Sequence, residues 1–214
     1  RLEAASGKKA FDIFDFFIGT SAGGINALNI GGLGMGSNEL EDFWSQENLN
    51  KTMSKSFWGT GSFLQTKPKY DGIGKREVLF NIFKDLSLGE SKKPVAVLAY
   101  DVEKRIPRLL SSYDEPGIKI LSAASATSAA PIYYSTQEID DGSWLIDGGI
   151  VANNPSLLGY AEAQKLFPNN NIKILSIGAG INRRKINGKN SSKWGAHNWF
   201  NHDILGIMLE LSIF

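Results

Sequence analysis

The chain contains no cysteine, and this absence excludes several kinds of site at once. Without a thiol it cannot form a disulfide, a thiolate metal site, an iron–sulfur cluster or a cysteine nucleophile. Histidine is scarce too: only His197 and His202 are present, five positions apart, with Asp203 as the one nearby acid. This spacing does not resemble a metal-binding pattern, so we expect no metal site.

Long apolar runs are also lacking. No uninterrupted apolar stretch reaches the roughly 18 residues of a membrane-spanning helix. Residues 1–9 carry basic side chains but no apolar segment of the kind found in secretory signals. We therefore expect a cytoplasmic protein that is soluble or associates with membranes only at their surface.

Neither sign of charge dominates the chain. Its 214 residues include 23 Lys and Arg against 22 Asp and Glu, giving a formal charge of +1. This balance argues against a nucleic-acid partner, which would require a concentrated basic surface. A hydrophobic content of 42% and this length fit one ordinary globular domain over residues 1–214. We expect that domain to be truncated at both ends, because residues 1–5 read as the tail of a helix and the chain stops at Ile213-Phe214.

Apolar runs and helical spacing alternate along the chain. Strands are predicted at residues 14–18, 94–100, 106–110 and 172–177, the third as an edge strand because it contains Pro107. Helices are predicted at residues 22–30, 74–86, 118–130 and 155–167, the last with Asn154 as its N-cap. Alternating strands and helices predict an α/β layer fold with a largely parallel sheet.

Two further segments have local signatures. Asn38 is placed to cap a helix, with Glu41 three residues later in the position that reaches back to the cap. Residues 51–70 have no regular period and contain Gly59, Gly61 and Pro68. We interpret them as a long irregular connection, a candidate cover over a site.

The segment Gly19-Thr20-Ser21-Ala22-Gly23 matches the pattern G-x-S-x-G between a predicted strand and a predicted helix. A serine on such a turn projects its hydroxyl away from the sheet. Gly19 and Gly23 leave room for the turn and for a substrate, and the Ala22 N–H lies at the helix N-terminus where an oxyanion could be stabilised. The alternative is a glycine-rich turn with a serine cap.

A serine hydroxyl needs a neighbouring base to become a nucleophile. His197 and His202 lie in a polar C-terminal region, whereas Asp147 follows a short apolar run and precedes two glycines. Asp147 could be held beside Ser21, with the glycines leaving space for substrate. An ordinary Asp-Gly turn explains the same residues equally well.

Together these residues resemble the patatin-like phospholipase family of lipid acyl hydrolases. Gly19-Thr20-Ser21-Ala22-Gly23-Gly24 is similar to the family's nucleophile elbow, and residues 147–155, Asp-Gly-Gly-Ile-Val-Ala-Asn-Asn-Pro, to its Asp-Gly-Gly motif. Residues 126–131, Ala-Thr-Ser-Ala-Ala-Pro, and 175–180, Leu-Ser-Ile-Gly-Ala-Gly, resemble two further family segments. The similarity covers about residues 11 to 180, in family order.

The resemblance implies a three-layer α/β/α patatin-like fold and a lipid acyl hydrolase of the phospholipase A or lysophospholipase type. Ser21 would be the nucleophile that forms an acyl-enzyme, and Asp147 the sole general base, without histidine. Ala22, Gly19 and Gly23 would form the oxyanion site and elbow. The substrate would be a membrane lipid or lysolipid, with no metal and no other cofactor. The family's Asp-Gly-Gly-Gly-x-Arg-Gly segment, which supplies oxyanion donors, is not among these 214 residues.

Two alternatives remain open. The order Ser21, Asp147, His197 also matches the Ser-Asp-His order of α/β-hydrolase esterases. A noncatalytic lipid-binding domain is the other. Arg183, Arg184, Lys185, Lys189 and Lys193 form a basic run, which is either a solvated loop or a patch for anionic lipid headgroups.

Overall fold

The structure is a computed structural model that describes residues 1–55, 67–180, 185–202, 204, 206 and 207. Its described strands are β1 (Phe17–Thr20), β2 (Val95–Asp101), β3 (Ile106–Ser111), β4 (Gln137–Glu138) and β5 (Trp144–Asp147). The described helices are α1 (Leu2–Ser6), α2 (Ala10–Ile13), α3 (Ala22–Ala27), η1 (Leu28–Gly32), α4 (Ser37–Phe43), α5 (Gln46–Thr52), α6 (Ile73–Phe83), η2 (Leu88–Glu90), α7 (Ile120–Thr127), α8 (Gly149–Ala152), α9 (Ser156–Leu166), α10 (Gly188–Ser191) and α11 (Ala196–Asn201).

Strand β2 is the centre of the sheet. It runs parallel to β1, with Phe17 opposite Val95 and Thr20 opposite Leu98. It pairs antiparallel with β3, and its C-terminal half pairs antiparallel with β5, placing Asp147 opposite Ala99. Strand β4 extends the sheet from β5. Strand β1, which leads into Ser21, and β5, which ends at Asp147, are therefore both anchored on β2.

The predicted α/β class is confirmed, but the described pairings are more antiparallel than the sequence pattern predicts. Only β1 with β2 is parallel among them. The connection between β2 and β3, residues 102–105, is too short for a crossover, so these strands must form a hairpin. The predicted strand at residues 172–177 is absent: this stretch has no strand partner, and its apolar side chains Ile174, Leu175 and Ile177 are exposed.

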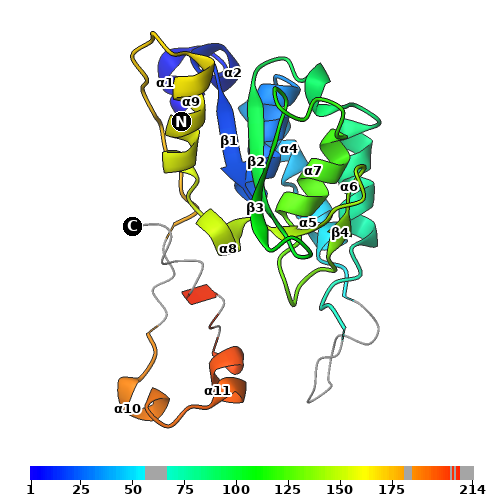
Figure 1. Ribbon diagram of the computed structural model, residues 1–214, viewed down its shortest axis with the longest axis vertical. Coiled ribbons are helices and arrows are strands. Elements are labelled where there is room, and N and C mark those ends of the chain that lie inside the picture. Colours follow the sequence, from blue (N-terminus) through cyan, green and yellow to red (C-terminus); the bar gives the residue numbers. More distant parts are fainter. Residues whose placement is uncertain (56–66, 181–184, 203, 205, 208–214) are drawn as a thin grey trace.

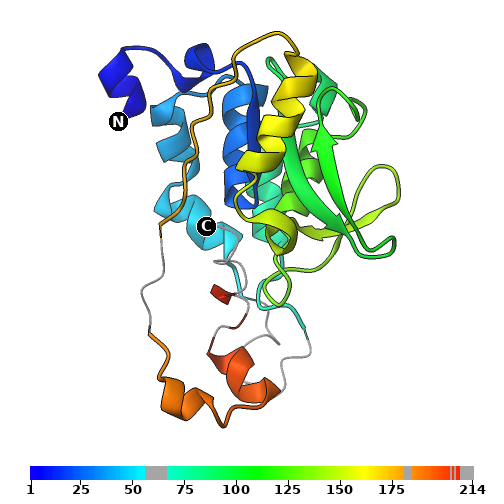
Figure 2. The same cartoon turned by 60° about the vertical axis from the view of Figure 1, so that its left-hand side comes forward.

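Helices cover both faces of the sheet. Figure 1 shows α9 on one side of β1 and β2, and α6 and α7 on the other. The alternation of β1 explains this arrangement, because successive side chains point to opposite faces. Ile18 meets α9 at Gly159, whereas Phe17 meets Gly31 of η1, which continues α3. The turned view in Figure 2 shows the same order, with α9 in front of the strands.

The hydrophobic core lies between β2 and the helices α3, α6 and α7. Residues 95–99 of β2 are almost completely buried, as expected for a central strand covered on both faces. The core cluster also includes Leu28, Leu79, Phe83, Leu110, Ile120 and Leu145. Burial of this cluster fixes the positions of the ends of β1 and β5, where Ser21 and Asp147 lie.

Most predicted helices are present with shifted ends. The predicted helix at residues 22–30 is α3 followed by a π-helical turn, η1. The N-cap predicted at Asn154 is one residue too early: the N-cap of α9 is Pro155, although the Asn154 side chain accepts from the Ser156 N–H at 3.1 Å. The cap predicted at Asn38 is wrong. The N-cap is Gly36, two residues earlier, so α4 begins at Ser37, and Glu39 reaches back to the Gly36 N–H at 2.7 Å. Within the predicted irregular connection, α5 extends to Thr52, and residues 56–66 lie outside the described part of the chain.

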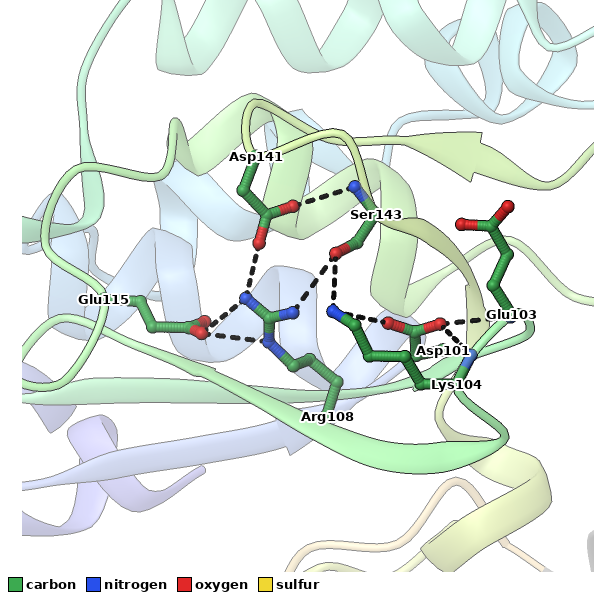
Figure 3. Close-up of polar contacts among 7 residues, drawn as sticks. All are labelled: Asp101, Glu103, Lys104, Arg108, Glu115, Asp141 and Ser143. Atoms are coloured by element: carbon green, nitrogen blue, oxygen red, sulfur yellow. Dashed lines mark hydrogen bonds and ion pairs between the residues drawn. The ribbon is translucent and has the colours of Figure 1, made fainter.

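An ionic network ties the turn between β4 and β5 to β3 (Figure 3). Arg108 of β3 pairs with Glu115 and, at 2.7 Å, with Asp141 of the turn. Its guanidinium also donates to the Ser143 Oγ at 3.3 Å. The Ser143 N–H in turn donates to Asp141 at 2.9 Å. A planar guanidinium with several partners holds a turn in one geometry better than a single ion pair does.

Candidate active site

Ser21 occupies a strained turn between β1 and α3. Strand β1 ends at Thr20 and α3 begins at Ala22, so Ser21 is the single residue between them. Its φ of 56° and ψ of −127° lie in a region that residues with a side chain rarely adopt. Such strain persists only where the surrounding structure enforces it, and it is found most often at functional sites. The predicted elbow is therefore present, with Ser21 at its tip.

Gly19 allows the turn to close. A Cβ at Gly19 would lie 2.1 Å from the backbone oxygen of Gly23 and 2.5 Å from the Gly24 nitrogen. At Gly23, by contrast, a Cβ would meet no atom within 4 Å. The two glycines of the motif therefore have different roles. Gly19 is required for the close approach of β1 to α3, and Gly23 faces open space beside Ser21.

Asp147 ends β5 and is 5% exposed. Its backbone N–H donates to the Ala129 carbonyl at 3.1 Å, and its Oδ1 accepts from the Gly149 N–H at 2.8 Å. Position 148, between Asp147 and Gly149, also requires glycine, because a Cβ at Gly148 would lie 2.2 Å from the Leu98 oxygen. The Asp-Gly-Gly segment is thus a tight turn that fixes the carboxylate.

The Ser21 Oγ donates a hydrogen bond of 2.7 Å to the Asp147 Oδ2. The two residues are 126 positions apart in the sequence, and the structure places them together without an intervening imidazole. Burial raises the pKa of the Asp147 carboxyl above its ordinary value, against the hydrogen bonds from Ser21 and Gly149 and the charge of Lys75. A raised pKa makes the carboxylate a stronger proton acceptor, which suits a general base.

The end of α7 supports both members of this pair. Thr127 accepts from the Ser21 N–H at 3.0 Å through its Oγ1 and donates to the Leu98 carbonyl of β2 at 2.6 Å. Two residues further on, Ala129 accepts from Asp147. The sequence pattern suggested no role for Thr127. The available signal was its place in residues 126–131, the segment quoted above for its family resemblance.

Thr20 makes a second hydrogen bond that the sequence pattern did not predict. Its Oγ1 donates to the Ala152 carbonyl of α8 at 2.9 Å. This bond joins the last residue of β1 to the helix that follows the Asp-Gly-Gly turn. The elbow and the carboxylate turn are therefore linked through the Thr20 hydroxyl and the Ala152 carbonyl as well as through the Ser21 to Asp147 bond.

Ala22 is the first residue of α3, so its N–H has no acceptor within the helix. This donor lies directly after Ser21, at the positive end of the helix dipole. Such a group can stabilise negative charge that develops on an oxygen bonded to the Ser21 acyl carbon. Ala22 therefore stays a candidate oxyanion donor by its position at the start of α3.

The two histidines lie in another part of the molecule. His197 is in α11, which both views place apart from the sheet (Figures 1 and 2). Its Nε2 lies 3.0 Å from the Asn201 amide nitrogen, and the His202 ring is 3.9 Å from the Trp194 ring, centroid to centroid. The structure does not bring either imidazole to the Ser21 and Asp147 pair.

Three other features complete the survey of the described residues. No group of three or more potential metal ligands is found among them. None of their helices has the length and apolar character needed to cross a bilayer. Of the predicted basic run, Lys185, Lys189 and Lys193 are exposed, while Arg183 and Arg184 lie outside the described part of the chain.

The closeness of Gly19 to α3 allows a stability test. Gly19→Ala should destabilise the fold by about 2–4 kcal/mol, because a rigid backbone cannot yield to the added methyl group. Gly23→Ala is the matched control, with an expected change between zero and a gain of about 1 kcal/mol, since a helical alanine is favoured over glycine. Urea unfolding followed by circular dichroism measures both, and equal midpoints for the two variants would contradict this account of the elbow.

Comparison with known proteins agrees with this geometry. The family model for the patatin-like phospholipase matches residues 2–158. Patatin-like protein 2 of Arabidopsis thaliana is 28% identical over 238 aligned residues, which cover 90% of this chain and 56% of that protein. The cGAMP-activated phospholipase of Escherichia coli is 32% identical, with 72% of this chain and 45% of that protein covered.

The chain spans about half the length of these curated relatives. Among solved structures, VipD from Legionella pneumophila is similar with a TM-score of 0.49 and 15% identity, covering 69% of this chain and 42% of that one. The matched family segment contains the elbow, the end of α7 and the Asp-Gly-Gly turn. By this match over most of its length, the chain belongs to the patatin-like phospholipase family.

Proposed function

We propose that this chain is a lipid acyl hydrolase of the phospholipase A or lysophospholipase type, acting through Ser21 and Asp147. The observation that carries the proposal is the 2.7 Å hydrogen bond from the Ser21 Oγ to the buried Asp147 carboxylate, made from a strained turn. Two coupled groups in this geometry are the arrangement that activates a serine hydroxyl. Family membership supports lipid esters as the substrate class.

The reaction would proceed in two steps, formation of an acyl-enzyme and its hydrolysis. In the first, Asp147 accepts the Ser21 proton while the Ser21 oxygen bonds to the acyl carbonyl carbon. The alcohol portion of the lipid then leaves, taking that proton from Asp147, and an acyl-enzyme remains. In the second, Asp147 accepts a proton from water as the water oxygen attacks the acyl carbon. The Ser21 oxygen leaves with that proton, and a fatty acid is released.

Both steps develop negative charge on the carbonyl oxygen. The Ala22 N–H is the donor that this chain supplies, from the N-terminus of α3. Open space at Gly23, two residues after Ser21, is compatible with access for an acyl group. The helix N-terminus and this open space support the proposal that the substrate carbonyl is bound at the elbow.

Exposed apolar side chains in the two helices that follow Asp147 suit a lipid substrate. Ile150 follows the Asp-Gly-Gly turn directly and is 47% exposed, and Leu157 at the start of α9 is 82% exposed. Apolar groups that stay in water near a site are suited to contact with acyl chains or a bilayer surface. We therefore propose peripheral contact with the membrane that holds the substrate.

A fluorophosphonate probe separates the dyad from its two alternatives. We expect the probe to label Ser21 in the wild type and equally in a His197→Ala, His202→Ala double variant, because neither imidazole contacts the dyad. Peptide mass spectrometry identifies the labelled residue. Labelling lost with the histidines would favour a Ser-Asp-His triad. Absence of labelling in the folded wild-type protein would favour a noncatalytic lipid-binding domain.

A further inference from the structure

Helix α6 contains a lysine in an unusual place. Lys75 is only 4% exposed, whereas lysines are almost never fully buried unless their charge has partners. It lies near the start of α6, and its side chain points across the core to the end of α7. A buried ammonium group is costly, so its surroundings should show what offsets that cost.

The Lys75 ammonium group binds the end of α7 through three oxygens. It donates to the Ser125 carbonyl at 3.3 Å, the Ser128 carbonyl at 3.1 Å and the Ser128 Oγ at 3.2 Å. The last carbonyls of a helix lack N–H donors within the helix and attract a positive charge. The nitrogen also lies 4.1 Å from the ring centroid of Tyr134, in the range of a cation–π contact.

This end of α7 is the segment on which the dyad depends. Thr127 holds the Ser21 N–H, and Ala129 holds the Asp147 N–H. Ser128 lies between them and is the main partner of Lys75. The ammonium charge also acts on the Asp147 carboxylate directly, favouring its ionised form. Lys75 therefore affects both dyad residues. It binds the backbone at the end of α7, and its charge acts electrostatically on Asp147.

Building on the proposed function, we infer that Lys75 is a positioning residue for the dyad: it fixes the end of α7 that holds Ser21 and Asp147, and it sets a positive charge on the side of that segment facing the base. Lys75 has no hydrogen bond to Ser21, so it is not a second base. Its role is to counter the burial of Asp147, which by itself would favour the protonated and inactive form.

Few other groups among the described residues affect whether the Asp147 carboxyl is protonated. Burial lowers the pKa of Lys75 to about 8, while the Asp147 charge opposes that shift. The groups that face Asp147 are the Ser21 hydroxyl, the Gly149 N–H and Lys75. Tyr134 faces Lys75, and its own pKa is raised to about 12 by burial, with Tyr70 and Asp71 adding to the shift, so it stays neutral. At neutral pH Lys75 is therefore the cation acting on the base.

The test compares Lys75→Met, which removes charge and donors, with Lys75→Gln, which keeps donors but not charge. Lys9→Met is the matched control, because Lys9 pairs with Glu39 on the surface. We expect the acid limb of the kcat/KM profile to move to higher pH by about one unit in both Lys75 variants. It should stay in place in the control. If the role of Lys75 were purely structural, the maximum kcat/KM would fall in Lys75→Met and recover in Lys75→Gln. The acid limb of the profile would then stay at the same pH in both variants.

A second measurement does not depend on turnover. Carboxyl NMR of aspartate-labelled protein follows the Asp147 titration, and its midpoint should rise by the same amount in both Lys75 variants. An unchanged midpoint would overturn the inference, whatever the activity. If the midpoint rises but the wild type hydrolyses no lipid ester and does not react at Ser21, the proposed function fails while the electrostatic link between Lys75 and Asp147 stands.

Discussion

Ser21→Ala is expected to abolish hydrolysis of phospholipid and lysophospholipid esters, lowering kcat by about 10³-fold or more. The reason is that the acyl-enzyme cannot form without the Ser21 oxygen, and Asp147 alone has no substrate proton to remove. The measurement is fatty-acid release from mixed micelles of phospholipid and detergent at pH 7 to 8.

The fold should survive this change. The Ser21 side chain is only partly buried, and the backbone bond from Ser21 to Thr127 is independent of the hydroxyl. Thermal unfolding by circular dichroism should therefore give a similar midpoint. Ser192→Ala is the control, because its hydroxyl is exposed and bonds only to the nearby Lys189 carbonyl. Lipid hydrolysis that continues in a folded Ser21→Ala protein would reject Ser21 as the nucleophile.

Asp147→Asn is expected to lower turnover by about 10²- to 10⁴-fold, the range attributed to a general base. The introduced amide can still accept from the Gly149 N–H, so the turn should be retained. Towards Ser21, however, it offers either an oxygen without useful basicity or an N–H that would reverse the hydrogen bond. The probe and lipid assays used for Ser21 also measure this loss.

The stability of Asp147→Asn should change in the opposite direction from its activity. Because burial raises the pKa of Asp147 in the folded state, the protonated carboxyl is favoured there, and stability falls as pH rises through the folded pKa. The wild type therefore bears the cost of an ionised buried group at pH 7, and the variant does not. Its unfolding midpoint should be equal or higher at pH 7, with the difference shrinking as pH falls toward the ordinary aspartate pKa.

A clear loss of stability at neutral pH would contradict this reading of Asp147. It would mean that the carboxylate contributes more to the fold through its hydrogen bonds than it costs through burial. Normal hydrolysis by the variant would contradict the dyad itself. Unfolding and hydrolysis are measured independently on the same protein. The unfolding midpoint tests the cost of burying the Asp147 charge, and the rate of hydrolysis tests its role as a base.

Local patterns were most reliable where one residue must satisfy a steric condition. The G-x-S-x-G spacing after an apolar run predicts a strand-to-helix turn, and the structure places Ser21 there with positive φ. Strand β2 was also predicted within a residue, since a continuous apolar run suits burial on both faces. Helix ends were less accurate. At the start of α4 the N–H groups of Gly36 and Ser37 donate to the carboxylates of Glu39 and of Glu3, and Glu3 is too distant in the sequence for a local pattern to include it.

Nonlocal pairing was harder to predict. Residues 172–177 have the composition of a strand, yet a strand also needs a partner with free hydrogen-bonding groups, and this segment has none in the described structure. Lys75 shows the same limit for a charged residue. In the sequence it is one of many lysines on helices, and only packing against α7 buries it.

The amino-acid order by itself determined the chemistry available to this protein: one serine on a glycine turn, one aspartate before two glycines, no thiol and no metal-binding pattern. Tertiary structure alone decided that these groups meet. Residues 126 positions apart come within hydrogen-bonding distance because β1 and β5 both pair with β2, and because the end of α7 binds the backbone of each. Those contacts depend on burial of a shared core, which no local pattern encodes.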